Sequence, residues 1–593
     1  MCGIAGVFGR GDRAVVEAML DTLTHRGPDD GHIVCGERFA IGARRLSIVD
    51  VAGGRQPLAN EDGTVVAAQN GEIYNFPELR PALLEAGHHL HTHTDTEVLP
   101  HLWEDYGDAL PEHIHGMFAV AVWDDRQQVG LLARDRMGKK PLYYWQSGGA
   151  LYFASELKAL LTIPGFSKRL NREALHHYLG YKHVPNPLSI FEGVSVLPPA
   201  HRLVFRAGGE PRLSRYWSLP FCRSTPVPDE REAVDELLVR LRRAVERRLM
   251  SDVPIGFFLS GGIDSSLTVA LAAELASSRI KTFTLTYSDQ ATTAGKEGDR
   301  TWARWVAERY DTEHHEETIS FSHYPDTLPL ILRAFDEPFA GVTSTYFLSQ
   351  RIAQYVKVAV AGDGADELFG SYLSHRLAAG MESSSIVNGQ PDWKWRSSLL
   401  VLSDEEKAAL YSPEARSLAP FSTAEHMRSA FDNLTGRDPL NRVLEAEWRG
   451  IFPDQVLTFV DRLSMAHSLE VRSAFLDTDV VEFVASLPGS MKIGGGLTKR
   501  LLKLAALRRF PEEMVHRPKE GFLMPITEWM RRDLRPWVRD TLAPSRLARH
   551  GVFSPAAVHS LVELLDRPDC DYRTVNKVLV LVIFQHWYEM YFE

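Results

Sequence analysis

The sequence contains few cysteines and no disulfide or zinc-binding pattern. Only four occur in 593 residues, they are far apart, and no C-x-x-C pair is present. We therefore expect neither a disulfide framework nor a structural zinc site, and the expected compartment is the reducing cytoplasm. The four are Cys2, Cys35, Cys222 and Cys570.

Long apolar runs and excess positive charge are also missing. No apolar run, Val578–Phe584 included, is longer than seven residues, whereas a membrane-spanning helix needs about 20. No basic stretch precedes the short apolar run at the N-terminus, so no signal peptide is predicted. The net charge is −11, which argues against nucleic acid or an anionic membrane as the main partner. Small molecules are the expected partners.

The remaining composition is that of a folded protein with two to four domains, at about 150 residues per domain. Residues 1–205 contain short strand-like segments separated by Gly, Asp and Asn clusters, with a few helical stretches, which predicts a layered α+β domain. The expected strands are Ile4–Phe8, Thr64–Gln69, Met117–Trp123, Gly130–Arg134 and Leu151–Ala154.

The pattern changes after a polar, proline-containing stretch, Cys222–Asp229. We take 206–230 as a linker and 231–593 as a second domain. Strand-like and helix-like segments alternate in it, which favours a parallel sheet covered by helices. From about residue 370 the segments are mostly helical. The alternating segments are Ile255–Leu259 (strand), Ser265–Ala276 (helix), Thr282–Thr286 (strand), Thr301–Tyr310 (helix) and Val356–Ala361 (strand).

Cys2 is a candidate nucleophile. Removal of Met1 would give it a free α-amine with a pKa of about 7.7–8.0, and this amine can take the thiol proton. A cysteine at position 2 is weak support by itself, and an Asn-Gly pair such as Asn70-Gly71 is most often a turn. The chain nevertheless offers Arg for a carboxylate, Asp and Glu for an ammonium group, and Asn-Gly for an oxyanion.

Five segments in order, MCGIAGVFG, HRGPD, RRLSIVD, NGEIYN and HTDTEV, resemble the glutaminase domain of class II glutamine amidotransferases. This resemblance implies an N-terminal-nucleophile fold with αββα layers. It implies that Cys2 attacks the glutamine amide, and that Asn70 and the Gly71 N–H form the oxyanion hole. Arg45 would hold the α-carboxylate and Glu72 with Asp95 the α-ammonium group. The implied glutamine-binding residues are Arg45, Leu46, Ser47, Ile48, Val49, Asn70, Gly71, Glu72 and Asp95.

A nucleotide site is indicated without a Walker loop, because no G-x-x-x-x-G-K-[ST] occurs. A predicted strand instead leads into Ser260-Gly-Gly-Ile-Asp-Ser-Ser266 and a helix. Glycines and a helix N-terminus suit phosphate, and Asp264 suits Mg²⁺. The loop resembles that of ATP pyrophosphatases, which leave an adenylate. A second strand end, Ala361-Gly-Asp-Gly-Ala-Asp366, carries two more carboxylates.

The order of the two halves resembles glutamine-hydrolysing asparagine synthetases of the bacterial type, as do Asp461–Asp477, Gly496–Lys499 and Arg517–Phe522. The resemblance implies ATP as co-substrate, Mg²⁺, aspartate as acceptor, a β-aspartyl-AMP intermediate and a homodimer. It implies catalytic roles for Asp363 and Lys499, besides Cys2, Asn70 and Gly71, and metal binding by Asp264 and Asp366. The implied ATP-binding residues are Leu259, Ser260, Gly261, Gly262, Asp264, Ser265, Leu285, Ala361 and Gly362.

Some positions depart from the family pattern. Asp363 stands where some members have Glu, and Ser473-Ala474-Phe475 stands where Val-Pro-Phe is usual. The stretch Ala340–Thr345 differs as well. These departures leave open a related amide synthetase with another carboxylate acceptor, such as a sugar acid, peptide or natural-product intermediate. A catalytically silent binding or regulatory protein is a third possibility.

Overall fold

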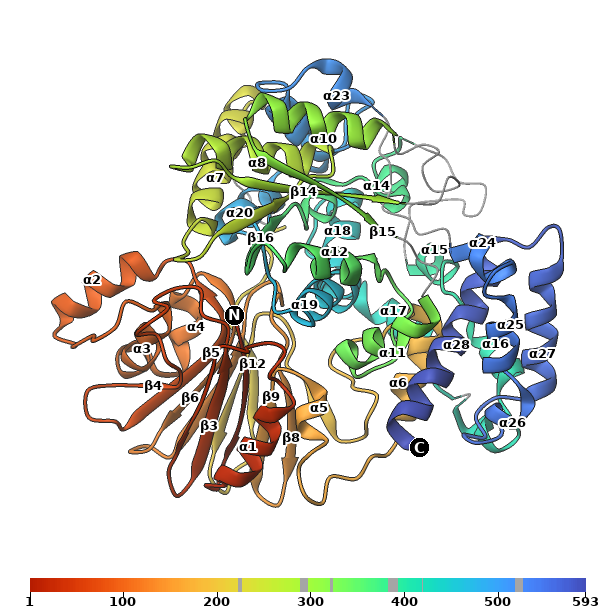
Figure 1. The fold of residues 1–593 in the computed structure, drawn as a ribbon, viewed down its shortest axis with the longest axis horizontal. Coiled ribbons are helices and arrows are strands. Elements are labelled where there is room, and N and C mark those ends of the chain that lie inside the picture. Colours follow the sequence, from red (N-terminus) through yellow and green to blue (C-terminus); the bar gives the residue numbers. More distant parts are fainter. Residues whose placement is uncertain (222–226, 288–296, 320–323, 382–392, 419, 518–525) are drawn as a thin grey trace.

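The computed structural model describes residues 1–593 except 222–226, 288–296, 320–323, 382–392, 419 and 518–525. Two antiparallel sheets lie together in the N-terminal part, and a parallel sheet surrounded by helices forms the next part (Figure 1). The C-terminal helices gather beside both. The predicted boundary stretch at Cys222 and most of the motif at 517–522 lie outside the described residues.

Each N-terminal sheet has six strands, and every pairing in it is antiparallel. The first has the order β10-β8-β9-β1-β3-β2 and the second β12-β11-β7-β6-β5-β4. The bounds in the first sheet are β1 Cys2–Phe8, β2 Asp30–Cys35, β3 Phe39–Arg45, β8 Tyr143–Ser147, β9 Ala150–Ala154 and β10 Val194–Val196. Those in the second are β4 Leu58–Ala59, β5 Val65–Ile73, β6 Gly116–Asp124, β7 Val129–Arg134, β11 His201–Arg206 and β12 Arg212–Arg215.

The two sheets pack face to face through apolar side chains. Phe8 of β1 stacks on Trp123 of β6, with ring centroids 5.4 Å apart, inside a buried cluster drawn from both sheets. Helices α1 (Arg13–Asp21) and α5 (Leu157–Leu160) share a core with the first sheet. Helices α2 (Phe76–Ala86) and α3 (Val98–Tyr106) cover the second. The predicted αββα layering is confirmed.

Two details differ from the sequence-based expectation. The strand predicted over Thr64–Gln69 continues as β5 to Ile73, so Asn70-Gly71 lies inside a strand and is not a turn. Pairing with β6 continues through these residues because Gly71 has no side chain to collide with the neighbouring backbone. The second sheet continues beyond residue 205 into the predicted linker, since β12 pairs with β11. The domain limits themselves stay a prediction.

The third sheet is parallel, as predicted, with the order β15-β14-β13-β16-β17. Helices α7 (Glu230–Arg248), α8 (Ile263–Leu275) and α10 (Glu297–Arg309) share a core on one face. Helix α12 (Ser344–Ile352) packs on the other face. The strands are β13 Ile255–Phe258, β14 Lys281–Tyr287, β15 Glu313–Ile319, β16 Val358–Ala361 and β17 Glu470–Ser473.

The C-terminal part is helical and joins the two sheet regions. Helix α28 (Tyr572–Phe592) shares an apolar core with α6 (Arg172–Tyr181) of the N-terminal part and α11 (Tyr324–Phe335). Hydrogen bonds also link Trp587 and Tyr591 of α28 to Asp336. Within the described part of the chain, no helix has both the length and the apolar character needed to cross a membrane.

Candidate active sites

Cys2 begins β1, an inner strand of the first sheet, and is buried. The Gln56 side-chain amide donates to its Sγ at 3.4 Å. Burial raises the pKa of the thiol, while the positive charges of the chain's amino group and of Arg45 oppose that rise. A thiol in this position depends on a nearby base to become the thiolate nucleophile.

Asn70 and Gly71 lie beside Cys2 on β5. In the amide orientation that its neighbours require, Asn70 donates to the Cys2 carbonyl oxygen at 2.7 Å and accepts from Arg26 at 3.3 Å. Gly71 has a φ of +149°, and a Cβ there would lie 1.9 Å from the Met117 carbonyl oxygen. No other residue fits at position 71 without moving the strand.

Two predicted carboxylates, Glu72 and Asp95, are buried near the same strand. Asp95 accepts from Gln69 at 2.8 Å and from the Ile73 N–H at 2.7 Å. Burial raises the pKa of both carboxyls, and for Glu72 the neighbouring Glu470 and Asp95 raise it further. A cation placed between them would lower the free-energy cost of keeping both carboxylates ionised.

The amino group of Met1 lies against these acids. It is 2.9 Å from Glu470 of β17 and 3.7 Å from Glu72. The Met1 side chain is buried with Leu46 and Ile48, two of the predicted glutamine-binding residues. Met1 therefore fills space between the predicted substrate residues and the parallel-sheet part.

Arg45 shapes the segment that follows it. Its guanidinium donates to the carbonyl oxygens of Val49, Asp50 and Val51 at 3.0, 2.7 and 3.2 Å. The loop is also fixed by a hydrogen bond from the Ser47 N–H to Asp29 at 2.8 Å. The predicted residues Arg45 to Val49 are thus held as one unit beside Cys2.

Several residues around Cys2 received no role from the sequence. Arg26 is buried and bonds to Glu156 at 2.8 Å and to Asp461 at 3.1 Å. Asp461 belongs to the other half of the chain, on α19 (Thr458–Met465). Arg26 lies within the HRGPD segment, so the sequence indicated that its surroundings matter. The sequence could not indicate that Arg26 pairs with a residue 435 positions away.

The second predicted site lies at the point of the parallel sheet where the strand order reverses. The chain runs from β13 through β14 to β15 on one side and returns to β16 on the other. Ligands of such sheets bind beyond the carboxyl ends of the strands at this point. The loop after β13 and the loop after β16 meet there, because a Cβ on Gly362 would lie 3.2 Å from the Asp264 Cβ.

Lys499 joins the two predicted metal ligands. Its Nζ lies 2.6 Å from Asp264 and 2.7 Å from Asp366. Burial alone would lower the pKa of Lys499, but the two carboxylates raise it overall. Three residues that are far apart in the sequence therefore form one charged cluster.

The loop before α8 is closed by its own serines. Ser260 and Ser265 share a hydrogen bond of 3.0 Å between their hydroxyls. Gly261 has a φ of +77°, and a Cβ there would lie 2.1 Å from the Asp299 carbonyl oxygen. Gly262 then caps α8. The backbone is thereby turned so that the start of the helix faces the Asp264 cluster.

The predicted adenine and nucleotide residues lie on the strand ends around this loop. Leu259 is fully buried after β13, and its N–H bonds to the Phe283 carbonyl at 2.8 Å. Leu285 is half-buried on β14, and Ala361 ends β16 before Gly362. These four residues share one end of the sheet.

Asp363 lines a small cavity of about 20 Å³. Lys139 and Lys140 of the N-terminal part line it too, with Arg472 and Ser473 of the parallel-sheet part. Burial, with a contribution from Asp366, raises the pKa of Asp363 to about 6. The volume suffices for one or two water-sized molecules.

Two kinds of site thus occur in one chain: a buried N-terminal cysteine with amide and carboxylate neighbours, and a charged loop cluster at a parallel-sheet switch point. Comparison with known proteins finds a family model for each half of the chain. The glutamine amidotransferase domain model matches residues 1–217, and the asparagine synthase model matches residues 236–589. The chain belongs to the asparagine synthase family.

Asparagine synthetase [glutamine-hydrolyzing] 1 of Bacillus subtilis is 31% identical, over 100% of this chain and 97% of its own length. Asparagine synthetase [glutamine-hydrolyzing] 3 of the same organism is 32% identical, over 88% of this chain and 87% of its own. A solved glutamine PRPP amidotransferase of B. subtilis covers 54% of this chain and 81% of its own at 16% identity, with a TM-score of 0.28, too low to bear on the fold. The protein is a ligase of the asparagine synthase family.

Proposed function

We propose that the protein hydrolyses glutamine at Cys2 and uses the ammonia to amidate the β-carboxylate of aspartate, with ATP as co-substrate. The products would be asparagine, glutamate, AMP and pyrophosphate. The observation that carries this proposal is the Asp264–Lys499–Asp366 cluster at the sheet switch point, in the same chain as the Cys2 site. The full-length similarity to glutamine-hydrolysing asparagine synthetases supports it.

In the glutaminase half, loss of Met1 would free the α-amine of Cys2 to take the thiol proton. It would also vacate the space beside Leu46, Ile48 and Glu72 that Met1 fills. The substrate's ammonium group would then lie near Glu72 and Asp95, and its carboxylate near Arg45. Asn70 and the Gly71 N–H would receive the oxyanion of the attacked amide.

In the synthetase half, the turned loop from Ser260 to Ser265 would receive the ATP phosphates at the start of α8. Leu259 and Leu285 would flank the adenine, with Ala361 and Gly362 along the nucleotide. Lys499 would neutralise negative charge as pyrophosphate leaves. Adenylation is needed because a carboxylate oxygen is too poor a leaving group for ammonia to displace. In the adenylate the leaving group is AMP.

Asp264 and Asp366 fit a Mg²⁺ ion, because their carboxylates already converge on one cation, the Lys499 ammonium. Oxygen donors are what Mg²⁺ prefers. Bound there, the ion would supply positive charge to the phosphate oxygens. Asp363 would act near the acyl carbon or on the attacking ammonia.

A sheltered route for ammonia is required because free ammonia is mostly ammonium at pH 7. Arg472 would lie along this route: its guanidinium is 3.6 Å from Glu72 near Cys2, and the residue is one of those that line the cavity at Asp363. A water-sized cavity suits ammonia. A homodimer and a cytoplasmic location stay predictions.

The test is pyrophosphate release with glutamine, ATP and a panel of carboxylate acceptors. Aspartate should stimulate release and yield asparagine, whereas the other acceptors should not. If saturating aspartate gives no pyrophosphate release while glutamine is still hydrolysed, the acceptor is another carboxylate. No activity with any acceptor and no glutaminase would favour a silent binding protein.

A further inference from the structure

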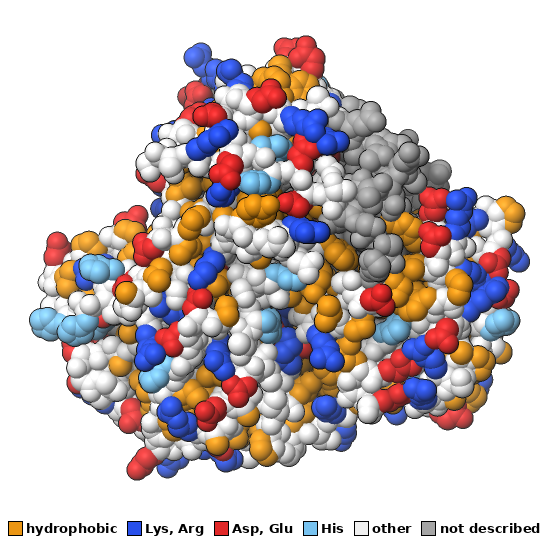
Figure 2. Space-filling model, viewed as in Figure 1, with side chains coloured by type: hydrophobic (Ala, Val, Ile, Leu, Met, Phe, Trp, Pro, Cys, Tyr) orange, Lys and Arg blue, Asp and Glu red, His pale blue; other side chains and the backbone are white. Residues whose placement is uncertain are grey.

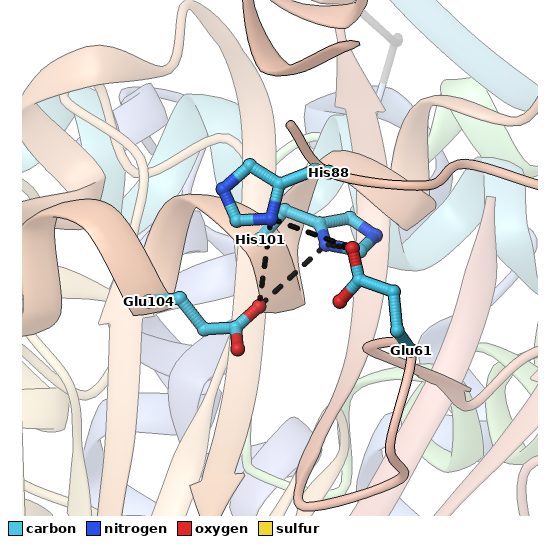
Figure 3. A group of neighbouring side chains, drawn as sticks. All are labelled: Glu61, His88, His101 and Glu104. Carbon is cyan, nitrogen blue, oxygen red and sulfur yellow. Dashed lines mark ion pairs between the residues drawn. The ribbon is translucent and has the colours of Figure 1, made fainter. Parts of the chain in front are cut away.

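Four side chains beside the second sheet of the glutaminase half converge on one another. They are Glu61, in the turn between β4 and β5, His88, just after α2, and His101 and Glu104, both on α3 (Figure 3). One ligand atom from each lies within 4.8 Å of all the others. This group is called the His–Glu cluster below.

The four His–Glu distances in the cluster are close to edge lengths of a tetrahedron around one ion. Glu61 Oε1 lies 3.5 Å from Nδ1 of both His88 and His101. Glu104 Oε2 lies 3.7 Å from His88 Nδ1 and 3.6 Å from His101 Nδ1. Tetrahedral bonds of about 2.05 Å put neighbouring ligand atoms about 3.4 Å apart. All four His–Glu distances therefore approach this value before any ion is bound.

His101 supplies the second, independent observation. Its ring is fully buried, and within the described part of the chain neither of its nitrogens has a hydrogen-bond partner. An unsatisfied buried nitrogen is costly, and a bound cation would satisfy Nδ1, which faces the two carboxylates.

The outer contacts prepare the other three residues as ligands. His88 Nε2 lies 3.2 Å from Asp105 Oδ1, and a proton shared there leaves the Nδ1 lone pair facing the cluster. Asn60 donates to Glu104 Oε1 at 2.9 Å, leaving Oε2 for the cluster. The His89 N–H donates to Glu61 Oε1, the oxygen that faces both imidazoles, at 2.7 Å and so fixes the position of this carboxylate. Carboxylate–histidine pairs of this kind orient metal ligands in proteins.

We propose that the His–Glu cluster is a Zn²⁺ site. Two imidazoles and two carboxylates form a donor set that zinc accepts, and the two negative charges balance the ion. The cysteine pattern predicted no structural zinc site, and this one uses no cysteine. Four protein ligands leave no open position, so the ion is structural.

The site ties three elements together. Zinc would fasten the β4–β5 turn and the end of α2 onto α3, which follows directly from the segment Asp95–Glu97 of the glutamine site. Glu61 and Glu104 are exposed, so the ion can enter from solvent. Figure 2 shows histidines gathered at the edge of the molecule where α2 and α3 lie.

That surface provides a matched control, because His89 and His91 are exposed neighbours outside the cluster. Zinc binding is measured by competition with a chromogenic chelator, in excess Mg²⁺ and in a Cys2→Ala background that removes the thiol as a ligand. We expect one tight zinc per chain. Glu61→Gln and Glu104→Gln should each weaken it about tenfold or more, and Asp105→Asn by a smaller factor. His89→Gln/His91→Gln should bind as the parent does.

Three results would overturn the proposal: no tight zinc in the parent, unchanged affinity in Glu61→Gln/Glu104→Gln, or loss of binding in the His89→Gln/His91→Gln control. Both glutamates are exposed, so these variants should fold. As a second readout, zinc should raise the melting temperature of the parent and not of Glu61→Gln/Glu104→Gln. Co²⁺ in place of zinc should give the visible spectrum of a tetrahedral site, and an octahedral spectrum would contradict the four-ligand geometry.

Discussion

At the scale of single residues, each site contains a buried charge that neighbouring charges of opposite sign neutralise. Lys499 holds two carboxylates together at the sheet switch point. Near Cys2, Arg472 lies between Glu72 and Glu470. A buried charge is tolerated only when it is paired. Removing one of these residues would therefore leave a buried charge without its partner.

The first prediction concerns Cys2→Ala. Glutamine hydrolysis should fall by at least about 10³-fold, because the nucleophile is lost while the binding residues remain. Synthesis from ammonium salts should continue, since the Asp264–Lys499–Asp366 cluster is formed by other elements. Glutamate release and asparagine formation are measured separately. Cys35→Ala is the control, because Cys35 is exposed; equal loss in both variants would contradict the assignment.

A second prediction concerns Glu337, which accepts from the Ile190 N–H at 2.7 Å and from Tyr143 Oη at 3.0 Å. Burial raises its pKa from 4.5 to about 7. Between these values the folded protein keeps a proton that the unfolded chain releases. The free energy of unfolding should therefore fall as pH rises through this window, by about 3 kcal/mol, and level off above pH 7.

Glu337→Gln has the shape of the neutral acid and cannot ionise, so it should remove this part of the pH dependence. The measurement is the urea midpoint of parent and variant at about pH 5 and about pH 8. The two proteins should be similar at the lower pH, and the variant should be more stable at the higher. A variant with the parent's full pH slope would show that Glu337 does not hold the proton.

At the scale of secondary-structure elements, strand ends and turns place the chemistry. The loops after β13 and β16 come together because these strands are parallel neighbours. Alternation of strand-like and helix-like segments was enough to predict this sheet, since it depends on local periodicity. The extent of β5 was not predictable: Asn70-Gly71 is locally a turn signal, and only pairing with β6 keeps it extended.

The third prediction tests the turn at Gly261. In Gly261→Ala the new Cβ would collide with the Asp299 carbonyl oxygen and require a φ of +77°, so the loop must shift. We expect ATP-dependent pyrophosphate release to fall by about tenfold or more, with about 1–3 kcal/mol lost in stability. Glutamine hydrolysis should be unchanged.

Gly262→Ala is the matched control, because its Cβ would lie 3.4 Å from Ser260 Oγ, at a φ of −74°. It should keep the parent's stability in thermal unfolding. If Gly261→Ala is as stable as this control and releases pyrophosphate as fast as the parent, the turn does not depend on a glycine.

At the scale of the whole molecule, a buried ionic network crosses from one half to the other. Asp461 of the synthetase half accepts from Arg26 at 3.1 Å and lies 3.2 Å from the Nζ of Lys140, both from the glutaminase half. Short motifs predicted each half and many of its candidate residues. They could not predict this network, because its members are hundreds of residues apart and meet only after both halves have folded.

The last prediction is that Asp461→Asn separates the two activities. The substitution leaves Arg26 and Lys140 buried with less opposing charge, which should cost about 3–5 kcal/mol. The contact between the halves lies beside both Cys2 and the cavity at Asp363, so synthesis from glutamine should fall more than synthesis from ammonium. The ratio of the two rates is the measurement.

Lys357→Gln is the control: Lys357 pairs with Asp29 across the same contact at 2.8 Å, but its side chain is 42% exposed, and such pairs contribute about 1 kcal/mol or less. An unchanged ratio in Asp461→Asn, or an equal change in Lys357→Gln, would show that the buried network does not couple the two sites.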